Sequence, residues 1–332
     1  MKKSNLLVAL VGMALFTWVI AHMGLPAILQ QLKSLRVALP ILLAFSICRL
    51  LLQTASWSYA LKTEGIAVAP TELMGTRLAS QSMGYLTVLG PVLSEPMKIN
   101  LLRTPAAQTI NATFLDDGVY WFTSALWLMA GCVCAGLVLA HGAALTWVLA
   151  LSTVLSFVLV LIARRKSILS SLVKVLGRRS PSWLYRAEKI ESSIREYRVQ
   201  QPDLVRRMFW IDLGCQILIA AEVAVVLWSL RLPFHLVTVL AIESLTRAVK
   251  MVSGWIPARL GADESGAMSS FMAAGLAPVS GLTLALTRRT RDLLWSLLGL
   301  AWLAWKSRAS EKPENNRQEP EMEGRLLCRS LS

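Results

Sequence analysis

Charged side chains inside apolar segments are the residues of this chain whose types and spacing point to chemistry. Three sets recur at helical spacing, each on one helix face: Glu243, Arg247 and Lys250; Arg77, Gln81 and Gly84; Arg49, Gln53 and Ser56. An ion inside a membrane costs about 3 kcal/mol on insertion scales, which makes it a functional candidate by default. The planar guanidinium of arginine donates two hydrogen bonds to a phosphate. These faces are therefore expected to line a path for an anionic lipid headgroup.

The sharpest local pattern combines helix breakers with ions. Its members are Gly254, Pro257, Arg259, Gly261, Asp263 and Glu264. Pro257 and Gly261 are expected to end the preceding helix, and Asp263 or Glu264 to open the next one. A carboxylate at a helix start is stabilised by the free N–H groups and by the dipole. Broken helices within a membrane are tolerated where they are buried or line water.

A similar stretch lies about 170 positions earlier in the chain. Arg77 aligns with Arg247, Gly84 with Gly254, and Glu95 falls within one residue of Glu264. The earlier stretch also carries Pro91, Ser94 and Lys98. This match predicts an internal repeat, although membrane sequences of restricted composition also match by chance. If span 37–61 and span 209–230 cross in opposite directions, the repeat has the inverted topology common in secondary transporters.

The elements that position these residues are predicted to be membrane-spanning helices. Hydrophobic types make up 55% of the 332 residues and charged types only 16%, which favours a polytopic all-α bundle over a soluble or disordered chain. Apolar spans are expected at 5–27, 37–61, 119–140, 144–163, 209–230 and 293–305. Two interrupted stretches, 71–118 and 233–291, are expected to re-enter the membrane or cross it twice. Scattered Cys and His residues exclude a disulfide framework and a zinc site, and no cofactor is expected.

The net charge of +14 is concentrated where it indicates membrane topology. Between residues 164 and 207 lie twelve basic and four acidic residues, typical of a cytoplasmic loop rather than a nucleic-acid interface. The expected organisation is a transmembrane domain at 1–306 with repeat halves near 37–140 and 207–306, a basic loop at 164–208, and a disordered tail at 307–332. Both termini are expected in the cytoplasm. Arg288, Arg289 and Arg291 oppose the charge bias and are expected to face a cavity or lipid phosphates.

Two motifs resemble those of a known family. The run from Pro257 through Gly261 to Glu264, and the run from Pro91 to Glu95, are similar to motifs of the membrane region of lysylphosphatidylglycerol synthases. This region also forms stand-alone flippase-like proteins, including hopanoid-associated members. Arg259 and Ser94 replace glycines of those motifs, and Lys98 replaces an arginine. Asp116 and Asp117 lie where the family often has an acidic and basic motif, and Arg291 lies near a late family arginine.

The resemblance implies movement of a lipid between the leaflets of the bacterial inner membrane. The expected substrate-binding residues are Arg77, Glu95, Lys98, Arg247, Arg259, Asp263, Glu264 and Arg291, with Gly84, Pro91, Gly254, Pro257 and Gly261 shaping the backbone. No ATP-binding motif is present, and no aminoacyl-transfer domain is expected. Two alternatives remain open. One is a membrane-embedded transferase that uses Asp116, Asp263 or Glu264 as a base, and the other is a non-transporting partner of a cytoplasmic lipid-synthesis enzyme.

Overall fold

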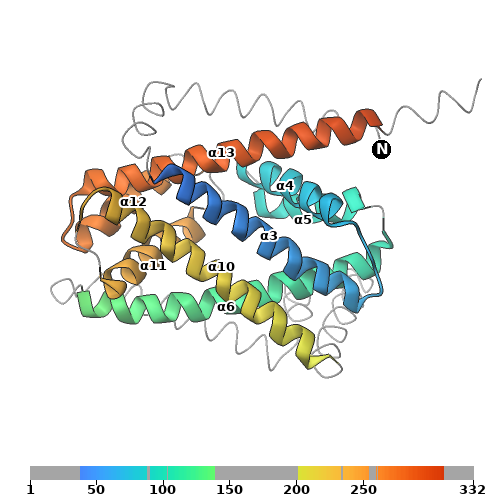
Figure 1. Ribbon diagram of the computed structural model, residues 1–332, viewed down its shortest axis with the longest axis horizontal. Coiled ribbons are helices and arrows are strands. Elements are labelled where there is room, and N and C mark those ends of the chain that lie inside the picture. Colours follow the sequence, from blue (N-terminus) through green and yellow to red (C-terminus); the bar gives the residue numbers. More distant parts are fainter. Residues whose placement is uncertain are drawn as a thin grey trace, which may run out of the picture.

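The computed structural model describes residues 38–87, 90–102, 104–138, 201–232, 235–253, 259 and 261–309, and within them the protein is all-α, as predicted. The eight helices of these ranges are α3 (Leu39–Thr63), α4 (Pro70–Leu86), α5 (Gly90–Leu102), α6 (Ala106–Val138), α10 (Pro202–Ser229), α11 (Leu236–Val252), α12 (Ala262–Ala273) and α13 (Pro278–Ala309). Figure 1 shows α3 and α10 crossing the middle of the bundle, between α13 along one edge and α6 along the other.

Three of the described helices are long and apolar enough to cross a membrane: α3, residues 106–136 of α6, and α10. They match the expected spans 37–61, 119–140 and 209–230, but α6 begins at Ala106 rather than near Val119. Asp116 and Asp117 therefore lie inside α6 and not at its start. The last expected span, 293–305, is part of the longer α13. The spans 5–27 and 144–163 and the basic loop fall outside the described residues.

The two halves of the protein have the same order of helix lengths. In the first half α3, α4, α5 and α6 have 25, 17, 13 and 33 residues. In the second half α10, α11, α12 and α13 have 28, 17, 12 and 32 residues. α13 reaches Ala309, so the helix continues three residues into the segment expected as a tail. Residues 310–332 lie outside the described residues.

The short helices form two pairs, one at each end of the bundle. At one end, Leu73 near the start of α4 and Leu102 at the end of α5 pack with Leu61 of α3 and Met208 of α10. At the other end, the cluster of Leu42 and Val226 includes Ile242 of α11 and Phe271 near the end of α12. α3 and α10 are antiparallel, because the end of α3 meets the start of α10. Each pair, α4–α5 and α11–α12, thus begins and returns at one end.

The halves interlock rather than forming separate domains. α4 packs extensively on α13, and α11 packs extensively on α6. Both contacts depend on glycine, because a Cβ at Gly299 would overlap the backbone of Leu78, and a Cβ at Gly131 would overlap the side chain of Ser244. Small residues allow helix backbones to approach closely in this way. Each half therefore supplies the last helix on which the other half's short helices pack.

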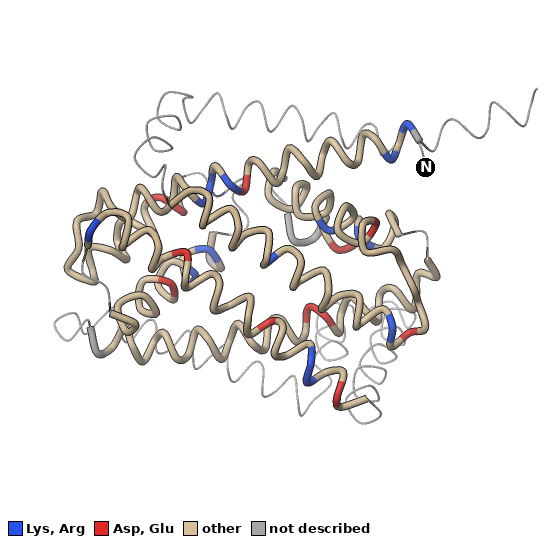
Figure 2. The backbone as a smooth tube through the Cα atoms, in the orientation of Figure 1, with Lys and Arg blue, Asp and Glu red and all other residues tan. Residues whose placement is uncertain are grey.

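One difference separates the two halves. α6 packs against both α3 and α10, whereas α13 contacts α10 only sparsely. The bundle is therefore closed along α6 and looser along α13. Charged positions lie in the middle of the helices as well as at their ends, as Figure 2 shows. These inner charges form the candidate site.

Candidate functional site

A first buried cluster joins α4, α6 and α10. Arg77 of α4 forms an ion pair with Asp116 of α6 at 3.3 Å and donates a hydrogen bond to the backbone oxygen of Gln53 at 2.5 Å. Asp212 of α10, which is buried beside them, accepts a hydrogen bond from the Ser56 hydroxyl at 3.5 Å. No ion pair of Asp212 occurs among the described residues. Asp116 is thus a partner of Arg77 and not a helix cap.

Lys98 extends this cluster along α5. Its ammonium contacts the Glu95 carboxylate at 2.8 Å and the Asp117 carboxylate at 3.7 Å. The same ammonium lies 5.9 Å from the ring centroid of Trp57, and the Arg77 guanidinium lies 6.0 Å from that ring. Cation–π contacts at such distances are attractive, more so when both groups are desolvated. Within the part of the chain that the structure describes, the first cluster therefore holds four carboxylates, on Glu95, Asp116, Asp117 and Asp212, and two cations.

A second buried cluster centres on Glu243 of α11. Its carboxylate accepts hydrogen bonds from Arg247 at 3.1 Å and from Arg288 of α13 at 2.7 Å. Arg247 also donates to the side-chain oxygen of Gln216 at 2.6 Å, and the Gln216 amide donates to Ser124 of α6 at 2.8 Å. Glu243 and Arg247, which the sequence placed on one helix face, therefore form an ion pair. It is one link in a network across four helices.

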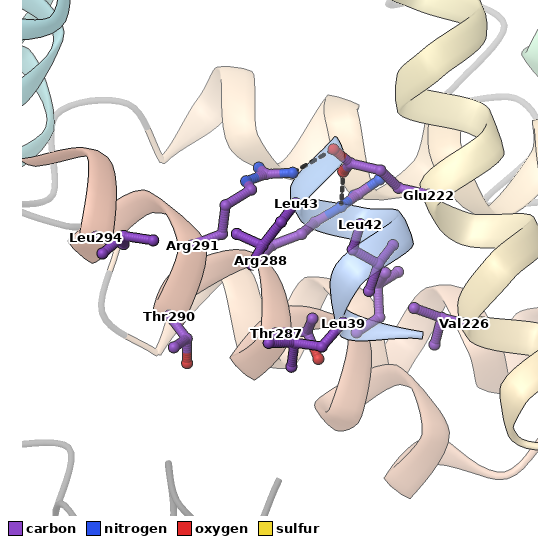
Figure 3. A pocket seen from close by; sticks show the side chains of 11 residues that line it. Leu39, Leu42, Leu43, Glu222, Val226, Thr287, Arg288, Thr290, Arg291 and Leu294 are labelled. Atoms are coloured by element: carbon purple, nitrogen blue, oxygen red, sulfur yellow. Dashed lines mark hydrogen bonds and ion pairs between the residues drawn. The ribbon is translucent and has the colours of Figure 1, made fainter. Parts of the chain in front are cut away.

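Glu222 of α10 joins this network to a cavity. Its carboxylate forms an ion pair with Arg291, and a second one with Arg288 at 3.4 Å. Arg291 also contacts Asp292 at 2.9 Å. Glu222, Arg288 and Arg291 line a cavity of about 220 Å³ between α3, α10 and α13. Figure 3 shows the two arginines reaching Glu222 from α13, with leucines of α3 on the facing wall.

A third cluster lies where the chain turns into α12. The Glu264 carboxylate forms an ion pair with Arg289 and accepts a hydrogen bond from the backbone N–H of Gly261 at 3.0 Å. Arg259 contacts Asp263 at 3.3 Å. Gly261 has a φ of 78°, in the left-handed region that glycine favours, and caps α12, which begins at Ala262. The sequence instead predicted that Asp263 or Glu264 opens this helix; both lie in its first turn.

The end of α4 meets this turn. The Arg259 guanidinium lies 5.6 Å from the ring centroid of Tyr85, one residue after Gly84 in the last turns of α4. The two helix pairs therefore start at opposite ends of the bundle and meet at their inner ends. Gly254 and Pro257, which were expected to shape this turn, lie outside the described residues. Pro91 lies at the start of α5.

The clusters repeat between the halves, with inverted charge at several positions. Gln53 and Gln216 are each the fifteenth residue of the first helix of their half, and Arg77 and Arg247 contact them. The eleventh residue of these two helices is Arg49 in α3 and Asp212 in α10. The eleventh and twelfth residues of the last helices are Asp116 and Asp117 in α6, but Arg288 and Arg289 in α13. A comparison that counts only identical residues therefore underestimates the correspondence between the two halves.

The eight predicted site residues do not meet at one point. Arg77, Glu95 and Lys98 lie in the first cluster; Arg247 and Arg291 lie in the second; and Arg259, Asp263 and Glu264 lie in the third. Glu95 and Glu264, the matched motif carboxylates, thus pair with different partners. The sequence prediction that Arg288 and Arg291 face a cavity is consistent with the lining of the cavity beside α13.

Several residues of these clusters were missing from the predicted site. They are Asp117, Asp212, Gln216, Glu222 and Asp292. The sequence named Asp116, Glu243, Arg288 and Arg289 in other roles: as a base, on a polar helix face, and as facing a cavity or lipid phosphates. A polar residue inside a long apolar run is the signal for Glu222 and Asp212. The pairing across helices has no such signal, because sequence spacing reveals only neighbours on one helix face.

Within the described residues, no group of His, Cys, Asp and Glu is placed to hold a metal ion. Comparisons of the chain with protein-family models, with curated proteins and with solved structures find no match. The functional argument therefore rests on the geometry of this site.

Proposed function

We propose that this protein is a multi-pass protein of the bacterial inner membrane that moves a lipid between the two leaflets, in the manner of the flippase-like proteins its motifs resemble. The observation that carries the proposal is the buried network of Glu222, Glu243, Arg288 and Arg291. Each of these side chains is at least nine-tenths buried in a bundle with three helices apolar enough to span a membrane. Intramembrane ions are expensive and typically mark a pathway for polar groups.

The arrangement of the short helices supports this proposal. A helix of 17 residues, such as α4 or α11, is about 25 Å long, less than the roughly 30 Å of a bilayer's hydrocarbon core. Each pair begins and returns at the same end of the bundle, and the pairs lie at opposite ends. This is the geometry expected of two re-entrant hairpins in an inverted repeat, which place a transport site near the midplane.

The alternative of a membrane-embedded transferase has less support. Its candidate bases, Asp116, Asp263 and Glu264, each form an ion pair with an arginine. A general base must lie within hydrogen-bond reach of the proton that it abstracts, whereas each of these carboxylates is already in contact with a guanidinium group. Lipid movement requires no such base, since paired ions can exchange partners with a headgroup.

Reconstitution in liposomes tests the proposal directly. Vesicles contain lipids with a fluorescent headgroup, and a membrane-impermeant quencher reports how fast inner-leaflet lipid reaches the outside. We expect the purified protein to accelerate this exchange for at least one headgroup class, and Glu243→Gln to slow it. Asp203→Asn, at an exposed ion pair on α10, is the matched control and should leave exchange unchanged. No acceleration with anionic, zwitterionic or isoprenoid lipids would contradict the proposal.

A further inference from the structure

We propose that the cavity between α3, α10 and α13 binds a lipid with a phosphate-containing anionic headgroup, and that the phosphate replaces Glu222 on Arg288 and Arg291. This inference rests on the proposed function and assigns its substrate a place and a chemical class. The cavity lies beside the second cluster. It includes Glu222, which the sequence did not assign to substrate binding, and Arg288, which the sequence expected to face a cavity or lipid phosphates.

The walls of the cavity suit a hydrocarbon chain. Most of the lining side chains are apolar: Leu39, Leu42, Leu43, Val226, Leu284 and Leu294. The hydroxyls of Thr287 and Thr290, which also line it, donate to backbone oxygens one turn earlier in α13. A wall of this kind offers little to a free inorganic anion, which loses its hydration without gaining polar contacts. An acyl chain gains from the burial of apolar surface.

The surface of the cavity is almost entirely apolar, and a phosphate meets the two arginines that border it only by displacing Glu222. Arg288 and Arg291 lie three residues apart on α13, and both reach the same Glu222 carboxylate (Figure 3). A carboxylate held by two guanidinium groups marks a position where a phosphate oxygen would find the same donors. Oε2 of Glu222 and Nε of Arg288 form no hydrogen bond in the described part of the chain, although they lie 3.4 Å apart. This contact is therefore the weakest of the network.

When a phosphate replaces Glu222, each of the two arginines keeps another carboxylate as a partner. Arg291 retains Asp292 at 2.9 Å, and Arg288 retains Glu243 at 2.7 Å.

A lipid has a route to this cavity along α13. α13 contacts α10 only sparsely, unlike α6, which packs against both central helices. Leu294, on the cavity wall, is 41% exposed on the surface of the described bundle. Among the described helices, none has to unfold for a lipid chain to enter from this side, and the headgroup follows along the arginine-bearing face of α13.

The decisive experiment measures binding rather than transport. Purified full-length protein in detergent is titrated with phosphatidylglycerol and with phosphatidylcholine of the same chains, and bound lipid is counted by native mass spectrometry. Sodium phosphate is the third probe and reports on a free anion. We expect phosphatidylglycerol to bind at least tenfold more tightly than phosphatidylcholine, because the two lipids share the phosphate but the choline cation is repelled by Arg288 and Arg291. Sodium phosphate should not displace it at millimolar concentration.

Two substitutions in the cavity should act in opposite directions. Arg291→Gln removes a donor and should weaken phosphatidylglycerol binding about tenfold. Glu222→Gln removes the competing carboxylate and should strengthen binding, while Asp292 and Glu243 still pair the two arginines. A purely structural network predicts that both substitutions destabilise the protein and neither improves binding. Weaker phosphatidylglycerol binding by the Glu222→Gln variant would contradict the proposal that a phosphate replaces Glu222 on the two arginines.

A third substitution tests the apolar wall. Leu43→Trp should fill the cavity and reduce phosphatidylglycerol binding at least tenfold, whereas Leu51→Trp on the same helix, at a position 53% exposed, should not. Equal binding by both variants would overturn the assignment to this cavity. Binding without leaflet exchange would refute the proposed function and keep the site. Leaflet exchange with unaltered binding in all cavity variants would refute the site and keep the proposed function.

Discussion

Arg288 connects two carboxylates that belong to different helices, and this position makes it the central residue of the second cluster. It pairs with Glu243 of α11 and with Glu222 of α10, and it donates to the backbone oxygen of Ile219 at 3.3 Å. A buried ion pair contributes little net stability when both partners are intact, because desolvation offsets the attraction. Removal of one partner is much more damaging, since it leaves a buried charge uncompensated.

Replacement of Arg288 by methionine should therefore destabilise the protein strongly. We expect a loss of about 3–5 kcal/mol, visible as a lower midpoint in thermal unfolding of the detergent-solubilised protein. Arg206→Met is the matched control. Its ion pair with Asp203 is largely exposed, and such pairs contribute at most about 1 kcal/mol. Similar midpoints for the two variants would show that Arg288 does not hold the helices together.

At the scale of elements, the second helix of each half packs on the last helix of the other half, α4 on α13 and α11 on α6. Both contacts depend on close approach at a glycine. Gly131 lies on α6 against Ser244 and the backbone of Leu240 on α11, and Gly299 lies on α13 against Leu78 of α4. The sequence predicted the helices themselves, because hydropathy and helical spacing are local properties. It did not predict which helices are neighbours, since glycine marks close contact without naming the partner. The early start of α6 was also missed, because Asp116 and Asp117 become tolerable inside a helix only through Arg77 and Lys98.

A single added methyl group distinguishes a packing glycine from a free one. Gly131→Ala should destabilise the protein by about 1–3 kcal/mol, the typical result of overpacking, because the new Cβ overlaps the Ser244 side chain. Gly136→Ala on the same helix meets nothing within 4 Å and should be neutral or slightly stabilising. Thermal unfolding of both variants under one condition gives the comparison. A tolerated Gly131→Ala would mean that α6 and α11 lie farther apart.

At the scale of the whole molecule, the two interlocked halves carry polar residues at matched positions. The sequence suggested the repeat through Arg77 and Arg247, which contact Gln53 and Gln216 at matched positions, one through the backbone oxygen and the other through the side-chain oxygen. It could not show that the last helices carry opposite charges at matched positions, Asp116 against Arg288, because charge inversion removes the sequence similarity it would need. The site was predicted in part for the same reason: the motif residues were recognisable, but their partners come from the other helices.

The proposed inverted topology makes a clear prediction about sidedness. The loop after α3 and the loop after α10 lie at opposite ends of the bundle, because α3 and α10 are antiparallel. In a cysteine-free background, Ala67→Cys should react with an impermeant thiol reagent only from the cytoplasmic side, and His235→Cys only from outside. Both positions are exposed in the structure. Labelling of both cysteines from one side would exclude the inverted repeat.

The difference between the two sides of the bundle predicts a motion that a cross-link should stop. If the two halves exchange conformations during transport, α6 must loosen its present tight packing on α10 and adopt the sparse contact that α13 now makes with α10. Ser124 of α6 and Gln216 of α10 share a hydrogen bond of 2.8 Å and mark the contact that must open. A short thiol cross-linker between Ser124→Cys and Gln216→Cys should abolish leaflet exchange, and cleavage of the linker should restore it. The two single variants, treated identically, control for loss of the side chains. Exchange at an undiminished rate in the cross-linked protein would show that α6 and α10 move as one body, and the lipid path would then lie along α13 alone.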